Sequence, residues 1–270
     1  MGLEKGLFQR TELLLGENLM NKISSKNVII FGTGGVGSWC AESLVRSGIR
    51  RLTIVDSDRI CMTNINRQIM ATVETIGQVK VEALKSRLLS INPNAQITAI
   101  QAIYNKTTFD SFKIGNYDYI LDCIDSLENK VLLILEATKT DAKFFSSMGA
   151  ALKCDFTQIR MSEFWKINGC ALAAAVRKRM RRNKTFPSKK FTCLYSPEIL
   201  ENKGKSQSCG TEKCLCPKST MSIGSHELTN HEWCSQKAQI NGTIAHTTAI
   251  FGFAMAGMVI NDMSEITGNE

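Results

Sequence analysis

A short apolar run that leads directly into a cluster of glycines constrains the fold of this chain more than any other feature. The stretch reads NVIIFGTGGVGSW and covers residues 27–39. NVIIF has the continuous apolar character of a strand that is buried on both faces of a parallel sheet. Gly32, Gly34 and Gly37 then form a G-x-G-x-x-G pattern where a helix would begin. Backbone amides at such a helix start bind phosphate, and glycine lets the ligand approach closely, so we expect a nucleotide site here.

Strand and helix patterns alternate through the first 150 residues of the chain. Helical patterns occupy residues 81–93 and 127–138, and Gly48 is expected to end the helix that follows the glycines. Further apolar strands are predicted at residues 51–56, 96–100, 118–125 and 143–149. This alternation predicts an α/β fold with a doubly wound, Rossmann-like and mostly parallel sheet.

The second part of the chain, residues 151–270, is less regular. TQIRMSEFW alternates like a strand, and CALAAAVRKRM is helical with a basic end. The polar, turn-rich stretch at about 200–235 is predicted to be a mobile loop. The apolar segment 243–263 is interpreted as a buried helix, with a membrane span as the alternative.

The charge of the chain is unevenly distributed, with a formal net value of +8. The run RKRMRRNKTFPSKK, residues 177–190, holds eight basic residues and no acidic one. A patch of one sign indicates a polyanionic partner such as RNA, and a solvated helix surface is the alternative. The start of the chain, MGLEKGLFQR, lacks the apolar core of a secretory signal, so a cytoplasmic protein with reduced thiols is expected.

Charged residues near the second predicted strand change what the glycine loop is expected to bind. Asp56 ends that strand, where a carboxylate would hold a ribose, and on this basis alone an NAD-dependent dehydrogenase is the default interpretation. Arg67 and Lys80 instead favour a nucleoside triphosphate, because charge develops on its phosphates during transfer. Asp122 and Asp125 follow a parallel strand, where a carboxylate could hold Mg²⁺ beside phosphate.

Each of these residues also has a simpler interpretation. Arg67 could pair with Asp58, and Lys80 could be an exposed helix lysine. Ion pairing or solvent exposure of single residues does not easily explain why all of these residues occur together in this order. Their combination favours a nucleotide site over a set of unrelated surface charges.

The motifs GTGGVGSW, D-x-D-x-I-x-x-x-N-x-N-R-Q, IGQVK and LDCIDS, in this order, resemble the ThiF/MoeB/HesA superfamily, whose members adenylate carboxylates with ATP. The resemblance implies that Asp56 holds the ribose, that Asp125 binds Mg²⁺, and that Arg10 in FQRTELLLG reaches across a homodimer interface. The ATP-binding residues it implies are Gly32, Gly34, Gly35, Gly37, Asp56, Asp58, Asn64, Arg67, Gln68 and Lys80. The catalytic residues it implies are Arg10, Arg67, Lys80 and Asp125.

Motifs in the second part narrow the resemblance to one branch, the tRNA threonylcarbamoyladenosine dehydratases. They are TQIRMSEFW, AAAVRKRMRR, CLYSPEIL and NGTIAHTTAIFGFAMAG. The resemblance implies adenylation of the carboxylate of threonylcarbamoyladenosine in tRNA, followed by ring closure with loss of water. It implies an ATP-binding region over residues 1–150 and a tRNA-binding and dimer region over residues 151–270. The expected tRNA contacts are Arg177, Lys178, Arg181 and Arg182.

The sequence also departs from these relatives. Cys170-Ala171-Leu172 stands where the branch usually has D-P-L. MoeB-type relatives carry two C-x-x-C pairs, which this chain lacks, so their structural zinc is not expected. An irregular metal site, thiols for a sulfur relay, and incidental thiols all remain open for Cys209, Cys214, Cys216 and Cys234.

Three other functions remain as alternatives. The first is an adenylyltransferase that activates the C-terminus of a ubiquitin-like sulfur carrier protein. The second is a nicotinamide-dependent oxidoreductase, which Arg67, Lys80 and Asp125 disfavour. The third is a catalytically idle RNA-binding module.

Overall fold

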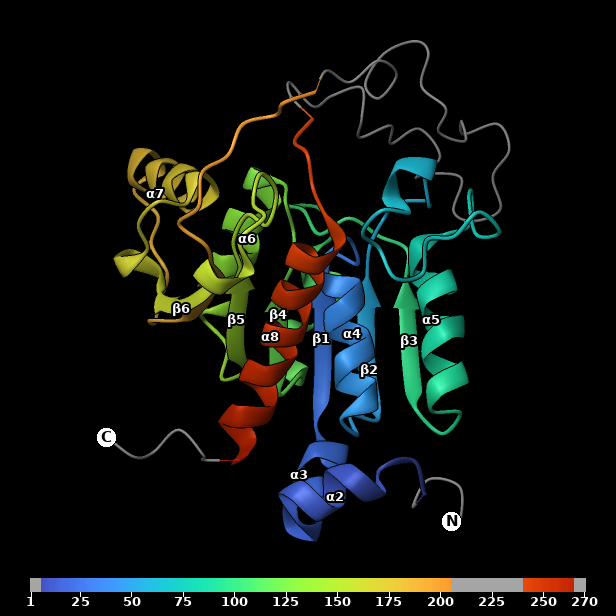
Figure 1. The fold of residues 1–270 in the computed structure, drawn as a ribbon. Coiled ribbons are helices and arrows are strands. Elements are labelled where there is room, and N and C mark those ends of the chain that lie inside the picture. Colours follow the sequence, from blue (N-terminus) through green and yellow to red (C-terminus); the bar gives the residue numbers. More distant parts are fainter. Residues whose placement is uncertain (1–5, 205–239, 265–270) are drawn as a thin grey trace.

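The computed structural model describes residues 6–204 and 240–264, and Figure 1 shows their arrangement. The described strands form one seven-stranded sheet in the order β3-β2-β1-β4-β5-β7-β6. All neighbours pair in parallel except β6 and β7, which are antiparallel. The strands are β1 Asn27–Phe31, β2 Arg51–Val55, β3 Gln96–Ile100, β4 Tyr119–Asp122, β5 Lys143–Ser147, β6 Arg160–Glu163 and β7 Thr192–Tyr195. The prediction of a doubly wound, mostly parallel α/β fold is confirmed.

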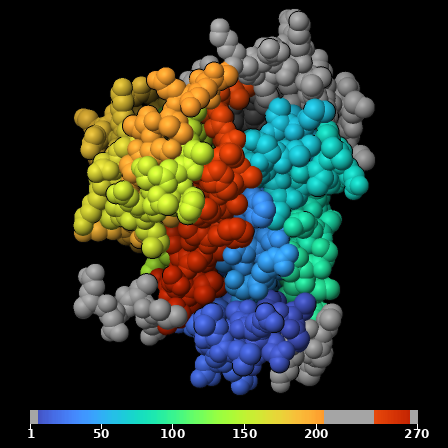
Figure 2. Space-filling model, in the orientation of Figure 1, coloured from blue at the N-terminus to red at the C-terminus, as the bar shows by residue number. Residues whose placement is uncertain are grey.

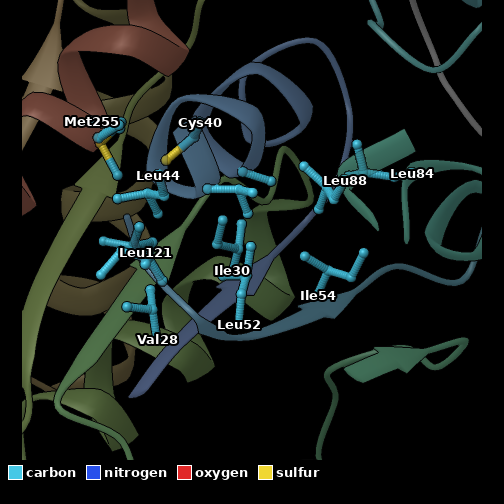
Figure 3. Close-up of a cluster of buried hydrophobic side chains, with 14 of the residues drawn as sticks. Val28, Ile30, Cys40, Leu44, Leu52, Ile54, Leu84, Leu88, Leu121 and Met255 are labelled. Atoms are coloured by element: carbon cyan, nitrogen blue, oxygen red, sulfur yellow. The ribbon is translucent and has the colours of Figure 1, made fainter. Parts of the chain in front are cut away.

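Helices cover both faces of this sheet (Figure 1). Strand β1 shows why, because Val28 and Ile30 belong to one buried cluster while Ile29 and Phe31 belong to the other. Figure 3 shows the first cluster, in which side chains of β1 and β2 meet side chains of α4, α5 and α8. The described helices are α2 Gln9–Leu15, α3 Glu17–Ser25, α4 Gly37–Arg46, α5 Lys80–Ile91, α6 Leu127–Ala137, α7 Ala171–Asn183 and α8 Ala245–Ser264.

Several predicted boundaries agree closely with the structure. The strands predicted at 27–31 and 96–100 are β1 and β3, and Gly48 follows α4 with a φ of 102°. The strand predicted at 118–125 is shorter, because β4 ends at Asp122 and the chain then leaves the sheet. Asp125 therefore lies in a loop beyond the strand.

The apolar segment near the end of the chain forms α8, which packs against α4 and the sheet. Its buried residues include Phe251, Met255 and Val259, so the prediction of a buried helix is confirmed. In Figure 2 the red α8 runs along the surface beside the blue residues of α4. Within the described residues, no helix has both the length and the apolar character that crossing a membrane requires.

Strands β6 and β7 extend the sheet that the first part of the chain builds. Two short 3-10 helices, Phe156–Gln158 and Phe164–Lys166, flank β6, in line with the less regular second part predicted from the sequence. The division into two regions at residue 150 stays a prediction. Most of the predicted loop at about 200–235, with its four cysteines, lies outside the described residues.

Two short helices that the sequence patterns did not predict, α2 and α3, precede β1. Because α3 ends at Ser25 and β1 begins at Asn27, both helices lie at the end of the sheet where β1 starts (Figure 1). Lys26 Nζ pairs with Asp118 Oδ1 at 2.9 Å and fixes this junction to the start of β4. The glycine loop follows the opposite end of β1.

Candidate nucleotide site

The glycine loop, residues 32–37, lies in the crevice where the strand order reverses between β1 and β4. Ligands bind at this position in doubly wound folds. Gly32 has a φ of 88°, and a Cβ there would lie 2.7 Å from the carbonyl oxygen of Cys123, just after β4. A Cβ on Gly37 would lie 1.8 Å from the carbonyl oxygen of Gly32. The loop is therefore too tightly closed for side chains at these two positions.

Gly37→Ala is expected to destabilise the protein strongly, while Gly34→Ala is its matched control. The nearest atom to a Cβ on Gly34 is Gln68 Nε2 at 3.8 Å, which is an ordinary contact. Overpacking at Gly37 should lower the free energy of unfolding by about 1–3 kcal/mol or more. Urea unfolding of the two variants measures the difference. Equal stability of Gly37→Ala and wild type would show that the loop does not close in this way.

Asp56 joins the end of β2 to the glycine loop. Its Oδ2 accepts hydrogen bonds from the Thr33 backbone nitrogen at 2.7 Å and from Thr33 Oγ1 at 3.1 Å. Its Oδ1 accepts from the Asp58 backbone nitrogen at 2.9 Å. Thr33 is fully buried, and it was not among the residues predicted to form the site. Its position between two glycines of the motif is the signal that could have identified it.

Lys80, the first residue of α5, is buried beside the carboxylates that follow β2. Its Nζ lies 2.6 Å from Asp58 Oδ2, and its side chain is only 6% exposed. Burial alone would lower the pKa of Lys80, but Asp58, Asp56 and Asp125 outweigh that effect and raise it. The interpretation of Lys80 as an exposed helix lysine is therefore wrong. The ammonium group stays charged at neutral pH.

The segment between β2 and α5 brings two amide side chains to this site. Asn64 is buried, and its Oδ1 accepts a hydrogen bond from the Cys61 backbone nitrogen at 2.9 Å, which caps the 3-10 helix Met62–Asn64. Gln68 is 5% exposed and lies next to Gly34. Its side-chain oxygen has no hydrogen-bond partner among the described residues. A buried polar atom of this kind is unusual and is satisfied when a ligand supplies a donor.

Arg67 lies against the glycine loop. Its Cδ would be 3.2 Å from a Cβ on Gly35, and its Nη1 donates to Thr63 O at 2.8 Å and to Asn66 Oδ1 at 2.9 Å. Trp39 Nε1, from α4, donates to Arg67 O at 2.9 Å and fixes the backbone there. Asp58, the proposed alternative partner of Arg67, forms its ion pair with Lys80.

The two carboxylates after β4 have different environments. Asp122 is fully buried and accepts hydrogen bonds from Lys130 Nζ at 2.7 Å, Ser146 Oγ at 2.6 Å and Ile124 N at 3.0 Å. With its oxygens engaged in this way, Asp122 is part of the protein interior and cannot serve as a metal ligand. Asp125 is exposed, and its charge acts on the Lys80–Asp58 pair. Of the two, only Asp125 fits a Mg²⁺ that is shared with phosphate oxygens.

The remaining predicted residues lie away from the glycine loop. Arg10 is exposed on α2, at the end of the sheet where β1 starts. The four predicted tRNA contacts all lie on α7, beyond the β5 side of the sheet (Figure 1). Arg177 is partly engaged, because its Nη1 donates to Phe164 O at 3.0 Å.

The described cysteines differ in their exposure. Cys40 and Cys170 are buried, Cys154 is exposed, and burial raises the pKa of the Cys40 thiol well above its usual value. Among residues 6–204 and 240–264 there is no group of three or more side chains that could bind a metal ion. Cys209, Cys214, Cys216 and Cys234 lie outside these ranges.

Comparisons with known proteins agree with this geometry. The tRNA threonylcarbamoyladenosine dehydratase of Escherichia coli is 30% identical over 261 residues, which cover 95% of this chain and 92% of the relative. The enzyme of that name from Haemophilus influenzae is 31% identical over 252 residues, which cover 90% and 87%. The crystal structure of the E. coli enzyme in complex with ATP superposes with a TM-score of 0.79 at 26% identity, covering 97% of this chain and 95% of that one. The sequence model of the ThiF family matches residues 8–269, and the chain belongs to this family.

Proposed function

We propose that this protein is an ATP-dependent tRNA threonylcarbamoyladenosine dehydratase. The observation that carries the proposal is the likeness to an ATP-bound dehydratase over 97% of the chain, because it includes both the glycine loop and the less regular second part. The substrate is tRNA that carries threonylcarbamoyladenosine. The proposed place of action is the cytoplasm.

The nucleotide lies along the glycine loop in this proposal. Asp56 holds the ribose, and the loop amides with Asn64, Arg67 and Lys80 contact the phosphates. The charged, buried Lys80 supports this assignment. Gln68, beside Gly34, accepts a hydrogen bond from the nucleotide. Mg²⁺, when bound through Asp125, neutralises charge on the phosphates.

The reaction begins when the carboxylate of the threonylcarbamoyl group attacks the α-phosphorus of ATP. The bond to the bridging oxygen breaks, and pyrophosphate leaves. A nucleophile within the same modification then attacks the acyl carbon, closes a ring and releases AMP. Overall, the modification loses one water. Arg67 and Lys80 stabilise the charge that develops on the phosphates, and the protein positions the reacting groups without a nucleophile of its own.

The test of this function is incubation of the protein with ATP and tRNA that carries threonylcarbamoyladenosine. Mass measurement of the isolated nucleoside should show the loss of one water, with AMP formed in equal amount. An unchanged nucleoside would contradict the proposal. AMP formation that instead requires a ubiquitin-like carrier protein would favour the sulfur-carrier adenylyltransferase.

A homodimer in which Arg10 completes the partner's site is part of the proposal. Within one chain, Arg10 and the glycine loop lie at opposite ends of β1, which favours action of Arg10 on the glycine loop of another subunit. Leu13 and Leu14, on the same helix, are 81% and 82% exposed, and contact with a second copy would bury them.

Mixing two inactive variants tests the role of Arg10 in the dimer. Arg10→Ala and Lys80→Ala homodimers should each be inactive, because every site lacks one required residue. After subunit exchange, each heterodimer has one complete site and one that lacks both residues. Random mixing should therefore restore about a quarter of wild-type activity, by the symmetry of a two-fold dimer. No recovery despite demonstrated exchange would exclude action across the interface.

The basic residues of α7 contact tRNA phosphates in this proposal. Lys178, Arg181 and Arg182 are exposed, while Arg177 is half-buried. Such contacts position the RNA and raise its affinity, and they carry little sequence information.

A further inference from the structure

Two exposed aromatic side chains lie next to an arginine on the α7 side of the molecule. Trp165, in the 3-10 helix Phe164–Lys166, is 38% exposed, and Phe186, just after α7, is 55% exposed. Their ring centroids are 6.1 Å apart. The guanidinium carbon of Arg181 lies 5.7 Å from the centroid of the Trp165 ring. We call Trp165, Phe186 and Arg181 the aromatic–basic patch.

Three contacts hold the segment beneath the patch in place. Glu163 Oε2 accepts a hydrogen bond from the Trp165 backbone nitrogen at 3.0 Å. The preceding residue, Phe164, is fully buried and stacks on Phe191 with ring centroids 4.9 Å apart. Arg177 also donates to Phe164 O at 3.0 Å. The exposed Trp165 side chain is therefore attached to a well-packed and hydrogen-bonded segment.

Phe186 reaches Trp165 because the chain turns back sharply at the end of α7. Lys184 has a φ of 53°, in the left-handed region, and the Thr185 backbone nitrogen donates to Met180 O at 3.0 Å. This turn places Phe186 on the same side of α7 as Arg181. The patch is thus built by segments that are apart in the sequence.

The surroundings of the patch are basic. Lys166, Arg182 and Lys184 are exposed and adjoin the patch residues in sequence. Exposed aromatic faces that alternate with cations are typical of surfaces that bind single-stranded nucleic acid, in which phosphates pair with the cations and unpaired bases stack on the rings. A duplex would use the cations only, because its bases are already stacked.

We propose that Trp165 and Phe186 stack on an unpaired base of the RNA substrate, while Arg181 holds a neighbouring phosphate. The proposal rests on the proposed function for the identity of the RNA, and it adds recognition of a base to the phosphate contacts of α7. α7 lies toward the end of the molecule at which the parallel strands finish, the end that carries the glycine loop (Figure 1). An unpaired tRNA loop can therefore approach the patch and the nucleotide site from one side.

The test compares binding of two labelled RNA probes that have equal numbers of phosphates. One is a hairpin with an unpaired loop, and the other is a blunt duplex. Replacing Trp165 and Phe186 together by leucine should weaken hairpin binding about ten-fold or more and leave duplex binding unchanged. Trp165→Phe should retain most of the hairpin affinity. Arg181→Gln should weaken both probes and flatten the slope of log affinity against log salt by about 0.7–0.9.

Phe156→Leu provides the matched control, because Phe156 is 54% exposed on a different 3-10 helix, Phe156–Gln158. It should bind both probes like wild type. Unchanged hairpin affinity in the Trp165 and Phe186 double variant would overturn the proposal. So would an equal loss for hairpin and duplex, or binding of a polyglutamate peptide in preference to both RNAs. The proposed function fails separately, if wild type binds the hairpin through the patch but never dehydrates the modified nucleoside.

Discussion

Lys80→Ala should lower the rate of adenylate formation about a hundred-fold or more, as measured by ATP–pyrophosphate exchange. The structure keeps this ammonium group charged by placing it 2.6 Å from Asp58 and near Asp56. A charge fixed in this way can stabilise the phosphates in the transition state without being reoriented during the reaction. Arg67→Ala should give a loss of similar size, because Arg67 lies against the glycine loop.

Lys85→Ala is the matched control for this experiment, since Lys85 lies on the same helix and is not buried. It should exchange pyrophosphate at the wild-type rate. Asp56→Ala should mainly weaken nucleotide binding, because its proposed partner is the ribose. Near-normal exchange by Lys80→Ala would refute the assignment of this lysine to the phosphates. Thermal unfolding of each variant separates a lost contact from a lost fold, since Lys80→Ala also leaves Asp58 unpaired.

The second large effect is expected on stability, at the buried ion pair of Lys130 with Asp122. Both side chains are 0% exposed, and their charged atoms lie 2.7 Å apart. Lys130→Met removes the cation and leaves a buried carboxylate without its counter-charge. The free energy of unfolding should fall by about 3–5 kcal/mol. Urea unfolding at neutral pH measures this loss.

Two further variants test whether the buried charge is the cause. Lys139→Met removes a lysine from an exposed pair with Glu136, whose side chains are 58% and 23% exposed, and should cost about 1 kcal/mol or less. Adding Asp122→Asn to Lys130→Met should recover part of the lost stability, because no net charge then remains buried. A double variant as unstable as Lys130→Met alone would point to lost packing instead.

The strands and the glycine loop could be predicted because their signals are local. NVIIF is apolar at every position that the sheet buries, and the close approach of Gly37 to Gly32 lies within the loop itself. The different environments of Asp122 and Asp125 could not be predicted in this way. Asp122 is enclosed because Lys130, on the following helix, and Ser146, on the next strand, both donate hydrogen bonds to it. Sequence spacing does not encode that convergence.

The burial of Lys80 could not be predicted from the sequence for a related reason. A lysine at the start of a helix is usually solvated, but this one is 6% exposed and pairs with Asp58, which lies 22 positions earlier in the chain. Asn64 was expected among the ATP-binding residues, and its capping of the 3-10 helix before Arg67 depends on backbone geometry that the sequence does not show. Trp165 and Arg181 likewise meet only in the folded chain, where the guanidinium carbon lies 5.7 Å from the centroid of the Trp165 ring.

The contact between α8 and the glycine loop has a consequence for the order of events during synthesis. A Cβ on Gly35 would lie 3.2 Å from Thr248, and one on Gly252 would lie 2.6 Å from the carbonyl oxygen of Val36. One side of the glycine loop is thus supplied by residues that lie about two hundred positions later in the chain. A ribosome-bound chain that has produced only the first five strands has this loop uncovered. The nucleotide site is completed only when residues 245–264 have emerged and packed against α4.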